Sequence, residues 1–246
     1  MDRKRGRTLA QTPGGHKIRR GPWSARFAIL QRLMGLYGRY IFPRLMDHVM
    51  SRAEFQQLRA ALLQSARGLV LEIGLGTGLN LPHYPNTISQ LQAVDPFPLL
   101  PDRLATRRAT APFSIEVSNI SAERLPYDDR TFDCVVSTWT LCTIPDPVAA
   151  LREIRRVLKP DGVFLFLEHG RSDEPKIAAW QDRLNPLQNV IGCGCNLNRK
   201  IDRLIAEAGL TITKLDRFAM RSVPRIGGEM YRGTAVATVP KTADGH

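Results

Sequence analysis

Residues 70–80 read Val-Leu-Glu-Ile-Gly-Leu-Gly-Thr-Gly-Leu-Asn, an apolar run followed by three glycines at alternate positions. The apolar run predicts a short buried strand, and the glycines predict a turn into a helix that begins near Leu79. Glycine adopts left-handed backbone conformations and lets the chain approach a ligand closely. A helix start adds unpaired N–H groups and the positive end of the helix dipole. We therefore predict that this turn wraps a nucleoside-bearing cofactor.

The spacing of the glycines indicates which cofactor. It is G-x-G-x-G, whereas dinucleotide enzymes use G-x-G-x-x-G. Glu72 stands two residues before the first glycine, where its carboxylate suits an ammonium group and would repel a pyrophosphate. These features favour the aminocarboxypropyl group of S-adenosylmethionine. Turns also use glycine for purely structural reasons, so the interpretation depends on the segments that follow.

A second predicted strand, residues 91–95, ends in Asp95, 19 residues after Gly76. In nucleotide-binding α/β folds an acid at this place takes the ribose hydroxyls. The alternative is that Asp95 caps the next helix, with Pro96 in its first turn. Both roles can coexist, and we favour ribose binding.

The chain then alternates predicted strands with predicted helices. The segments are a strand at 113–117, a strand at 133–138, a helix at 145–158 stopped by the turn at 159–162, and a strand at 163–167. Such alternation favours a mostly parallel sheet that is covered on both faces.

This order of motifs resembles the class I S-adenosylmethionine-dependent methyltransferases. The matching motifs are the strand before E-x-G-x-G-x-G, the strand before Asp95, A-E-x-L-P-x-D at 122–128, D-x-V at 133–135 and L-K-P-x-G at 158–162. The resemblance implies an α/β, Rossmann-like fold with a seven-stranded sheet, mostly parallel with an antiparallel last strand. Helices cover both faces, and a helical extension precedes the sheet.

The resemblance also implies a set of cofactor contacts, with Ser121, Ala122 and Glu123 around the adenine. The complete predicted set is Glu72, Gly74, Gly76, Gly78, Asp95, Pro96, Ser121, Ala122, Glu123 and Thr138.

Further motifs narrow the family. They are Tyr40–Met46, Leu141-Cys142, Glu168-His169, Trp180-Gln181 and Gly194–Arg199. This set is similar to the small methyltransferase-like proteins that include the animal membrane-associated alkyl-thiol methyltransferases. Leu75 replaces the usual cysteine of G-C-G-T-G, a change we expect to affect only packing. The animal relatives have an apolar N-terminal membrane anchor, and we expect none here.

Composition agrees with one large domain in the cytoplasm. The chain has 246 residues, enough for a full α/β core. No apolar run reaches the roughly 18 residues of a membrane-spanning helix, and no secretory signal opens the chain. Cys193 and Cys195 form a C-x-C without a nearby histidine in the sequence, which is a poor zinc site. We therefore predict no metal.

The positive charge is concentrated at the start of the chain. The net charge is +12, and residues 1–52 hold twelve Arg and Lys against two acids, a net of +10.

We divide the chain into a disordered basic tail, a helical lid or cap, a methyltransferase domain and a C-terminal tail: 1–22, 23–66, 67–240 and 241–246. Residues 23–42 have a basic amphipathic pattern. We favour a lid over the cofactor, with peripheral membrane contact through 23–50 as the alternative. A basic tail also attracts nucleic acid, but no recognition motif accompanies it. The oligomeric state is left open.

Two pairs of residues fall at the carboxyl ends of strands, where ligands bind in such sheets. They are Thr138-Trp139 and Glu168-His169. His169 is the candidate catalytic base or substrate orienter, because an imidazole titrates near neutral pH; alternatively it bonds a loop carbonyl. Trp139 either walls the pocket, which we favour, or stacks on the sulfonium.

The predicted substrate contacts are Trp139, Glu168, Trp180, Asn196 and Arg199. Arg199 has an alternative role beside the predicted helix 200–208, which Gly209 stops. We predict methyl transfer to a small apolar acceptor, with a thiol first and a lipid amine or quinone ring next. The competing hypothesis is a non-catalytic cofactor-binding protein that acts through its basic N-terminus on a membrane or nucleic acid.

Overall fold

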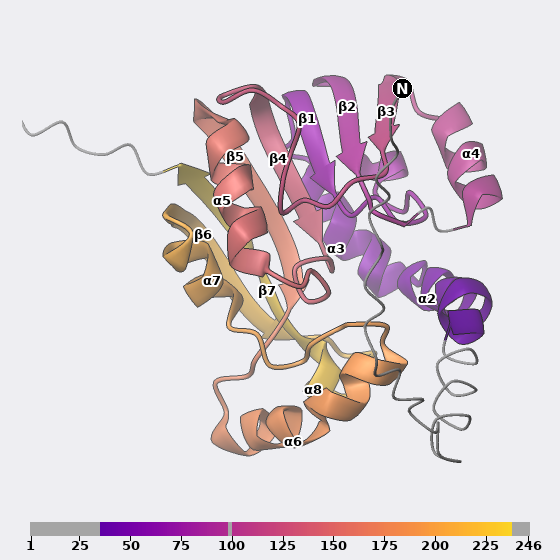
Figure 1. Cartoon of the computed structure of the whole chain (residues 1–246), viewed down its shortest axis with the longest axis vertical. Coiled ribbons are helices and arrows are strands. Elements are labelled where there is room, and N and C mark those ends of the chain that lie inside the picture. The colour runs from indigo at the N-terminus through magenta and orange to yellow at the C-terminus, as the bar shows by residue number, and fades with distance from the viewer. Residues whose placement is uncertain (1–34, 98–99, 238–246) are drawn as a thin grey trace, which may run out of the picture. The chain divides into compact units, whose positions relative to one another are not determined.

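The structure is a computed structural model that describes residues 35–97 and 100–237. Within these residues seven strands form one sheet in the order β3-β2-β1-β4-β5-β7-β6 (Figure 1). The strands are β1 (Gly68–Ile73), β2 (Ile88–Val94), β3 (Ser114–Ser118), β4 (Phe132–Thr138), β5 (Leu158–His169), β6 (Leu210–Ala219) and β7 (Glu229–Ala237).

The strand directions confirm the predicted topology. Strands β1 to β5 pair in parallel, and β7 is antiparallel to both of its neighbours, β5 and β6. The chain runs outward from β1 to β3 and then returns to β4 on the other side of β1. In open α/β sheets ligands bind at such a reversal, which here is at the carboxyl ends of β1 and β4.

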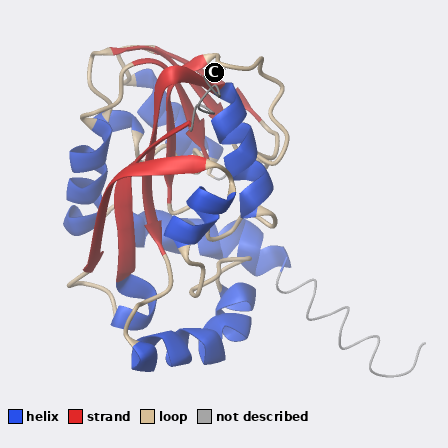
Figure 2. Ribbon diagram, turned by 90° about the vertical axis from the view of Figure 1, so that its left-hand side faces the viewer, coloured by secondary structure: helices blue, strands red, loops and turns tan. Residues whose placement is uncertain are grey.

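Helices lie on both faces of the sheet (Figure 2). The helical elements are η1 (Tyr37–Ile41), α2 (Phe42–Met50), α3 (Ala53–Leu63), η2 (Leu81–His83), α4 (Pro101–Ala109), α5 (Pro147–Val157), α6 (Pro175–Ile191), α7 (Ile201–Glu207) and α8 (Arg225–Gly228). Helices α6 and α8 lie beyond the end toward which the parallel strands point (Figure 1). The carboxyl edge therefore has its own helical cover.

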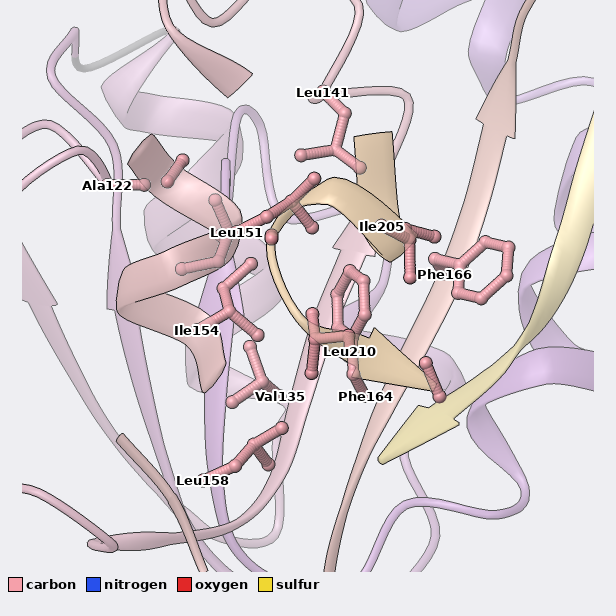
Figure 3. Close-up of a cluster of buried hydrophobic side chains, with 14 of the residues drawn as sticks. Ala122, Val135, Leu141, Leu151, Ile154, Leu158, Phe164, Phe166, Ile205 and Leu210 are labelled. Carbon is pink, nitrogen blue, oxygen red and sulfur yellow. The ribbon is translucent and has the colours of Figure 1, made fainter. Parts of the chain in front are cut away.

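Strand β5 shows how the sequence divides the core. Side chains alternate along a strand, so Phe164 and Phe166 face one side and Leu165 and Leu167 face the other. The first pair packs with residues of α5 and α7 (Figure 3). The second pair shares its cluster with apolar residues of α3. All four side chains are fully buried, which holds the strand ends in fixed positions.

The turn after β1 differs from the prediction. No α-helix begins near Leu79, and the described chain has only the three-residue 3-10 helix η2 there. Pro85 explains the early stop, because a proline disfavours helical backbone in the residue before it. Tyr84 is accordingly extended, with ψ 135°. The helix dipole that we expected behind the glycines is therefore missing.

The predicted N-terminal cap is only partly described. Residues 1–34 lie outside the described part of the chain, and so do 238–246, so the predicted tails and the start of the lid are not covered. Helix α3 packs on the sheet through Phe55, Leu62 and Leu63, which are buried. Among the described helices, none has both the length and the apolarity needed to cross a bilayer.

Candidate active site

The glycine loop, residues 74–80, follows β1 at the centre of the carboxyl edge. Gly74, Gly76 and Gly78 have φ of 77°, 55° and 78°, conformations that favour glycine. A Cβ on Gly74 would collide with the Thr140 side chain, and one on Gly78 would come within 2.9 Å of Leu104. A Cβ on Gly76 would meet nothing within 4 Å. The middle of the loop therefore faces open space.

Asp95 braces this loop from the end of β2. Its Oδ2 accepts a hydrogen bond from the Gly76 N–H at 2.8 Å, and its Oδ1 accepts one from the Phe97 N–H at 3.0 Å. The alternative cap role is wrong, because α4 begins only at Pro101 and its N-cap residue is Leu100. Burial raises the pKa of Asp95, against these two hydrogen bonds. Each carboxylate oxygen retains a lone pair for another donor.

Glu72 lies beneath the loop and is buried. Tyr84 Oη donates to its Oε2 at 2.8 Å, and Asn80 Nδ2 donates to its Oε1 at 2.9 Å. Burial raises the pKa of the Glu72 carboxyl to about 7, although both hydrogen bonds oppose the rise. A cation next to Glu72 would therefore favour its charged form.

Arg59 on α3 is a buried cation that the sequence analysis missed. Its Nη1 donates to Asn80 Oδ1 at 2.7 Å and to Thr138 Oγ1 at 3.0 Å. Its guanidinium lies 4.7 Å from the centre of the Trp139 ring. Burial lowers the pKa of Arg59 to about 10. A sequence signal existed, because Arg59 falls on the apolar face of α3 with Phe55.

Asp47 on α2 is a second residue that the sequence analysis missed. It accepts hydrogen bonds from Thr77 Oγ1 at 2.5 Å and from Arg107 at 2.8 Å, and it pairs with Arg103. Arg107 also donates to the Thr77 carbonyl at 2.7 Å. Burial opposes ionisation, but Arg107, Thr77 and Arg103 lower the pKa of Asp47 to about 2. Asp47 thus ties α2 and α4 to the glycine loop.

The predicted adenine loop is held by its own side chains. Ser121 Oγ donates to Glu123 Oε2 at 2.7 Å, and the Asp146 N–H donates to Glu123 Oε1 at 2.7 Å. Ala122 is buried in the core cluster drawn in Figure 3. The glutamate therefore connects this loop to the start of α5.

At the ends of β4 and β5, Glu168 is buried. Its Oε1 accepts from Ser137 Oγ at 2.7 Å and from the Thr140 N–H at 3.1 Å. Burial raises its pKa. Trp139 has φ 50° and packs against Phe55 with 5.4 Å between ring centres. These contacts fit a wall of the crevice better than an exposed stacking platform.

Next to them lies a group that we call the thiol–imidazole cluster, formed by Cys142, His169 and Cys195. His169 Nε2 lies 3.0 Å from Cys195 Sγ, and the two sulfur atoms are 3.7 Å apart. The ring therefore faces a thiol, whereas our alternative prediction gave it a loop carbonyl. Burial opposes protonation, but the contact with Cys195 raises the pKa of His169. Our prediction of no metal considered only sequence neighbours, and the fold supplies the histidine that the C-x-C lacks.

The predicted substrate residues Asn196 and Arg199 make structural ties. The Asn196 N–H and Nδ2 donate to the Cys142 carbonyl at 3.0 and 2.9 Å. Arg199 Nη1 donates to the Leu141 carbonyl and, at 2.7 Å, to the Ile144 carbonyl. Together they fasten the turn after β4 to the loop before α7. Trp180 is 50% exposed on α6, where Arg183 stacks on it.

Three buried polar atoms of the described residues lack a hydrogen-bond partner. They are Arg59 Nε, Glu168 Oε2 and His169 Nδ1. Native proteins leave few buried polar groups unpaired, and functional sites are one place where they do. Two of these residues end β5 and the third hydrogen-bonds to Thr138 at the end of β4. The unpaired atoms therefore make the carboxyl edge the candidate site.

An open apolar groove of about 270 Å³ lies between α6 and α8. Its lining includes Leu184, Leu187, Ile191, Leu197, Val223 and Ile226. Leu187 is 59% exposed. The helical cover of the carboxyl edge therefore offers an apolar surface.

Comparison with known proteins agrees with this site. Residues 71–166 match the model of a family described as a methyltransferase domain. The chain is 31% identical over 175 residues to the thiol S-methyltransferase TMT1B of Rattus norvegicus, covering 67% of this chain and 69% of the relative. It is 29% identical over 161 residues to a phosphatidylethanolamine N-methyltransferase of Cereibacter sphaeroides, covering 63% of this chain and 76% of that protein.

A solved structure shares the fold. It is the 1,6-didemethyltoxoflavin-N1-methyltransferase of Burkholderia thailandensis, with 1,6-didemethyltoxoflavin and S-adenosylhomocysteine bound. The TM-score is 0.59 with 18% identity, and the match covers 94% of each chain. At this identity the likeness concerns the fold.

Proposed function

The chain belongs to the class I S-adenosylmethionine-dependent methyltransferases, and on this premise we propose that it methylates a small apolar acceptor, with a thiol as the first candidate. The relatives named for thiols and for a lipid amine support the two leading acceptor classes. A non-catalytic role is not favoured, because these relatives are methyltransferases. A lipid amine ranks second and a quinone ring third.

The glycine loop fits the cofactor. The open space above Gly76 admits a ligand to the backbone, and Asp95 beside it has lone pairs for the ribose hydroxyls. Glu72 would hold the ammonium group. We assign the cofactor's carboxylate to Arg59, whose Nε is buried without a partner. Ser121, Ala122 and Glu123 would border the adenine, with Pro96 and Thr138 at the neighbouring strand ends.

The bound cofactor supplies an electrophilic methyl group on a sulfonium. The protein's own task is to align the acceptor and to exclude water. Trp139 and Phe55 wall the crevice, and the α6–α8 groove offers apolar contact for an alkyl chain. His169, next to Cys195, is placed to orient the acceptor or to accept its proton. We propose that the other predicted substrate residues support the acceptor side of the site. They are Glu168, Trp180, Asn196 and Arg199.

The observation that carries the thiol preference is the likeness to relatives named as thiol S-methyltransferases, and the apolar cover agrees with it. Sulfur is intrinsically more nucleophilic toward carbon than the nitrogen of an amine or the oxygen of a phenol. A thiol therefore needs less help from a base than a phenol or an amine.

The test is a methyl-transfer assay on a matched panel. The acceptors carry one hexyl chain and end in a thiol, a primary amine or a phenol. We expect the thiol to exceed the others in kcat/KM by about tenfold, because sulfur is the most nucleophilic of the three acceptor atoms. Faster methylation of the amine or the phenol would contradict the thiol assignment, and no methylation of any acceptor would contradict the proposed substrate class.

A further inference from the structure

The thiol–imidazole cluster has the composition and spacing of a metal site. Its three donor atoms come from the turn after β4, the end of β5 and the loop before α7, and they all lie within 4.8 Å of one another. A zinc–sulfur bond is about 2.3 Å long, so two sulfurs on a tetrahedral zinc are about 3.8 Å apart. The sulfurs of Cys142 and Cys195 are 3.7 Å apart. The protein therefore already holds both thiols at the separation that tetrahedral zinc requires.

The backbone around these thiols is fixed before any ligand arrives. Asn196 makes two hydrogen bonds to the Cys142 carbonyl, so the segment carrying Cys195 is fastened to the segment carrying Cys142. Cys193 and Gly194 take positive φ of 49° and 99°, which turn the chain back toward β4. Such a preformed arrangement lowers the ordering cost of binding.

The donors have little other bonding to lose. Among the described residues, the contacts of Cys142 Sγ outside the cluster are weak, at 3.4 Å to Thr143 Oγ1 and 3.6 Å to the Trp139 carbonyl. His169 Nδ1 has no partner, so no carbonyl competes for the ring. The hydrogen bond that Cys195 donates to Cys142, together with burial, raises the pKa of Cys195 and favours its neutral form. A bound cation reverses this preference, because it takes the thiolate directly.

We propose that Cys142, His169 and Cys195 bind one zinc ion whose fourth position takes the thiol of the methyl acceptor. Three protein ligands with one open position are the arrangement of catalytic zinc, and two cysteines with one histidine form one such ligand set. Two thiolates balance the charge of the ion. The metal site stands on the geometry alone, while its use for a thiol rests on the proposed function.

The cluster borders the cofactor side of the crevice. Cys142 contacts the Trp139 carbonyl, the Trp139 ring stacks on Arg59, and Arg59 hydrogen-bonds to Asn80 of the glycine loop at 2.7 Å. A thiol on the metal would therefore be next to the residues that we assign to the cofactor.

The step balances without an oxidant or a reductant. The acceptor thiol binds the metal as a thiolate and releases its proton to solvent, so in this arrangement His169 orients the acceptor through the metal and is not its base. Its sulfur then forms the new bond to the methyl carbon, and the bond from that carbon to the sulfonium sulfur breaks with its electron pair remaining on that sulfur. The product is a neutral thioether, a weaker zinc ligand than a thiolate, which favours its release.

Cobalt(II) titration of the chelator-treated full-length protein tests the metal site, because cobalt replaces zinc and reports tetrahedral thiolate ligands by visible absorption. We expect one cobalt per chain, displaced by zinc. Cys142→Ser and Cys195→Ser should each weaken binding about 100-fold or more, since each removes one of only three ligands. The control Cys193→Ser, two residues from Cys195 and exposed, should bind as the parent does.

Retained melting temperature and S-adenosylhomocysteine affinity establish that each variant folds. His169→Ala provides a second ligand test without altering a thiol. Binding below one metal per chain, or equal binding by the parent and the Cys142→Ser, Cys195→Ser and His169→Ala variants, would overturn the site. So would an intact mass showing that the freshly purified protein has a Cys142–Cys195 disulfide in place of metal.

Adding 1-hexanethiol to the cobalt protein separates this inference from the proposed function. We expect the sulfur-to-cobalt absorption to increase as a third thiolate binds, and 1-hexanol to leave it unchanged. Absence of that increase would overturn the thiol position even if the metal binds. Thiol methylation by a protein that binds no metal would overturn the inference and leave the proposed function standing. A protein that binds the metal and the thiol but does not methylate the thiol would overturn the proposed function and leave the inference standing.

Discussion

The glycine loop and the thiol–imidazole cluster lie on the same edge of the sheet, yet their side chains are paired in opposite ways. Around the loop, Asp47 meets three donors, and Glu72 and Asp95 meet two donors each. In the cluster, the His169 ring has one hydrogen-bond partner among the described residues, a thiol, and its Nδ1 has none there. A loop whose carboxylates are already held in place by protein donors suits one constant ligand. A cluster whose sulfur and nitrogen atoms make few other bonds suits an incoming metal or acceptor.

This contrast assigns different consequences to mutations on the two sides. Carboxylates around the loop contribute to folding as well as to binding, because their partners belong to separate helices and strands. Removing one partner of a buried ion pair leaves an uncompensated charge. Changes on the loop side should therefore alter stability and cofactor affinity, and changes in the cluster should alter metal and acceptor binding.

The largest effect is expected at Asp47. Asp47→Ala should lower the free energy of unfolding by about 2–3 kcal/mol, since it removes charged hydrogen bonds to two arginines and to Thr77. Denaturant unfolding of the full-length protein measures this. Asp128→Ala, an exposed control, should change stability by less than about 0.5 kcal/mol.

The pH dependence of stability gives a second test of the role of Asp47. Its pKa of about 2 lies below the ordinary 3.8, so its contribution is complete above about pH 4 and is lost as the pH falls through 2. Equal loss of stability in the parent and in Asp47→Ala over this range would contradict the assignment.

Asp95→Ala should weaken S-adenosylhomocysteine binding by about 1–3 kcal/mol, if the carboxylate accepts the ribose hydroxyls and also holds the Gly76 N–H. Calorimetric titration measures this. Asp161→Ala, exposed at the start of β5, is the matched control and should bind as the parent does. Unchanged affinity in Asp95→Ala would restrict Asp95 to shaping the turn.

Glu72→Gln should weaken S-adenosylmethionine binding about tenfold at pH 8 and less at pH 6. The reason is that the pKa of about 7 leaves the carboxylate largely charged only above neutral pH, and the ammonium group needs that charge. In the cofactor-free protein the charge on Glu72 has the opposite effect. Because burial raises its pKa, ionisation of this carboxyl lowers the stability of the folded protein. Stability from this group should fall as the pH rises through 7, and Glu72→Gln should remove that fall.

Exposed Glu207→Gln is the control for both Glu72 measurements. A parent protein whose cofactor affinity is flat between pH 6 and 8 would contradict the contact between Glu72 and the ammonium group.

The smallest effect is expected from deleting residues 1–22. All described partners of the glycine loop lie at residue 47 or later, so turnover should stay within about twofold of the parent. Steady-state kinetics with the preferred acceptor measures this. A large loss of kcat would mean that the deleted segment shapes the site.

Local patterns in the sequence predicted the five parallel strands, the glycine loop and the place of Asp95, because short apolar runs and glycine turns depend on near neighbours. The number of strands and the antiparallel last strand came from the resemblance, and the strand order came only from the structure. The expected helix after the loop was wrong, because the effect of Pro85 on Tyr84 was overlooked. Local pattern alone therefore describes the framework of the cofactor side.

The rest of the candidate site depends on contacts between segments that are distant in the sequence. Asp47 and Arg107 are 60 residues apart, and Cys142 and Cys195 are 53 apart. No spacing rule joins such pairs until the topology of the sheet is known. Asn196 and Arg199 show the same limit, because their carbonyl partners lie in the turn after β4.

The central claim is that the cofactor and the acceptor share the carboxyl edge, one on the loop side and one on the cluster side. A crystal structure with S-adenosylhomocysteine bound tests it most directly. We expect the ribose within hydrogen-bond distance of Asp95 and the product's sulfur facing the turn that carries Trp139 and Cys142. A ribose away from Asp95, or a sulfur facing away from that turn, would contradict the account.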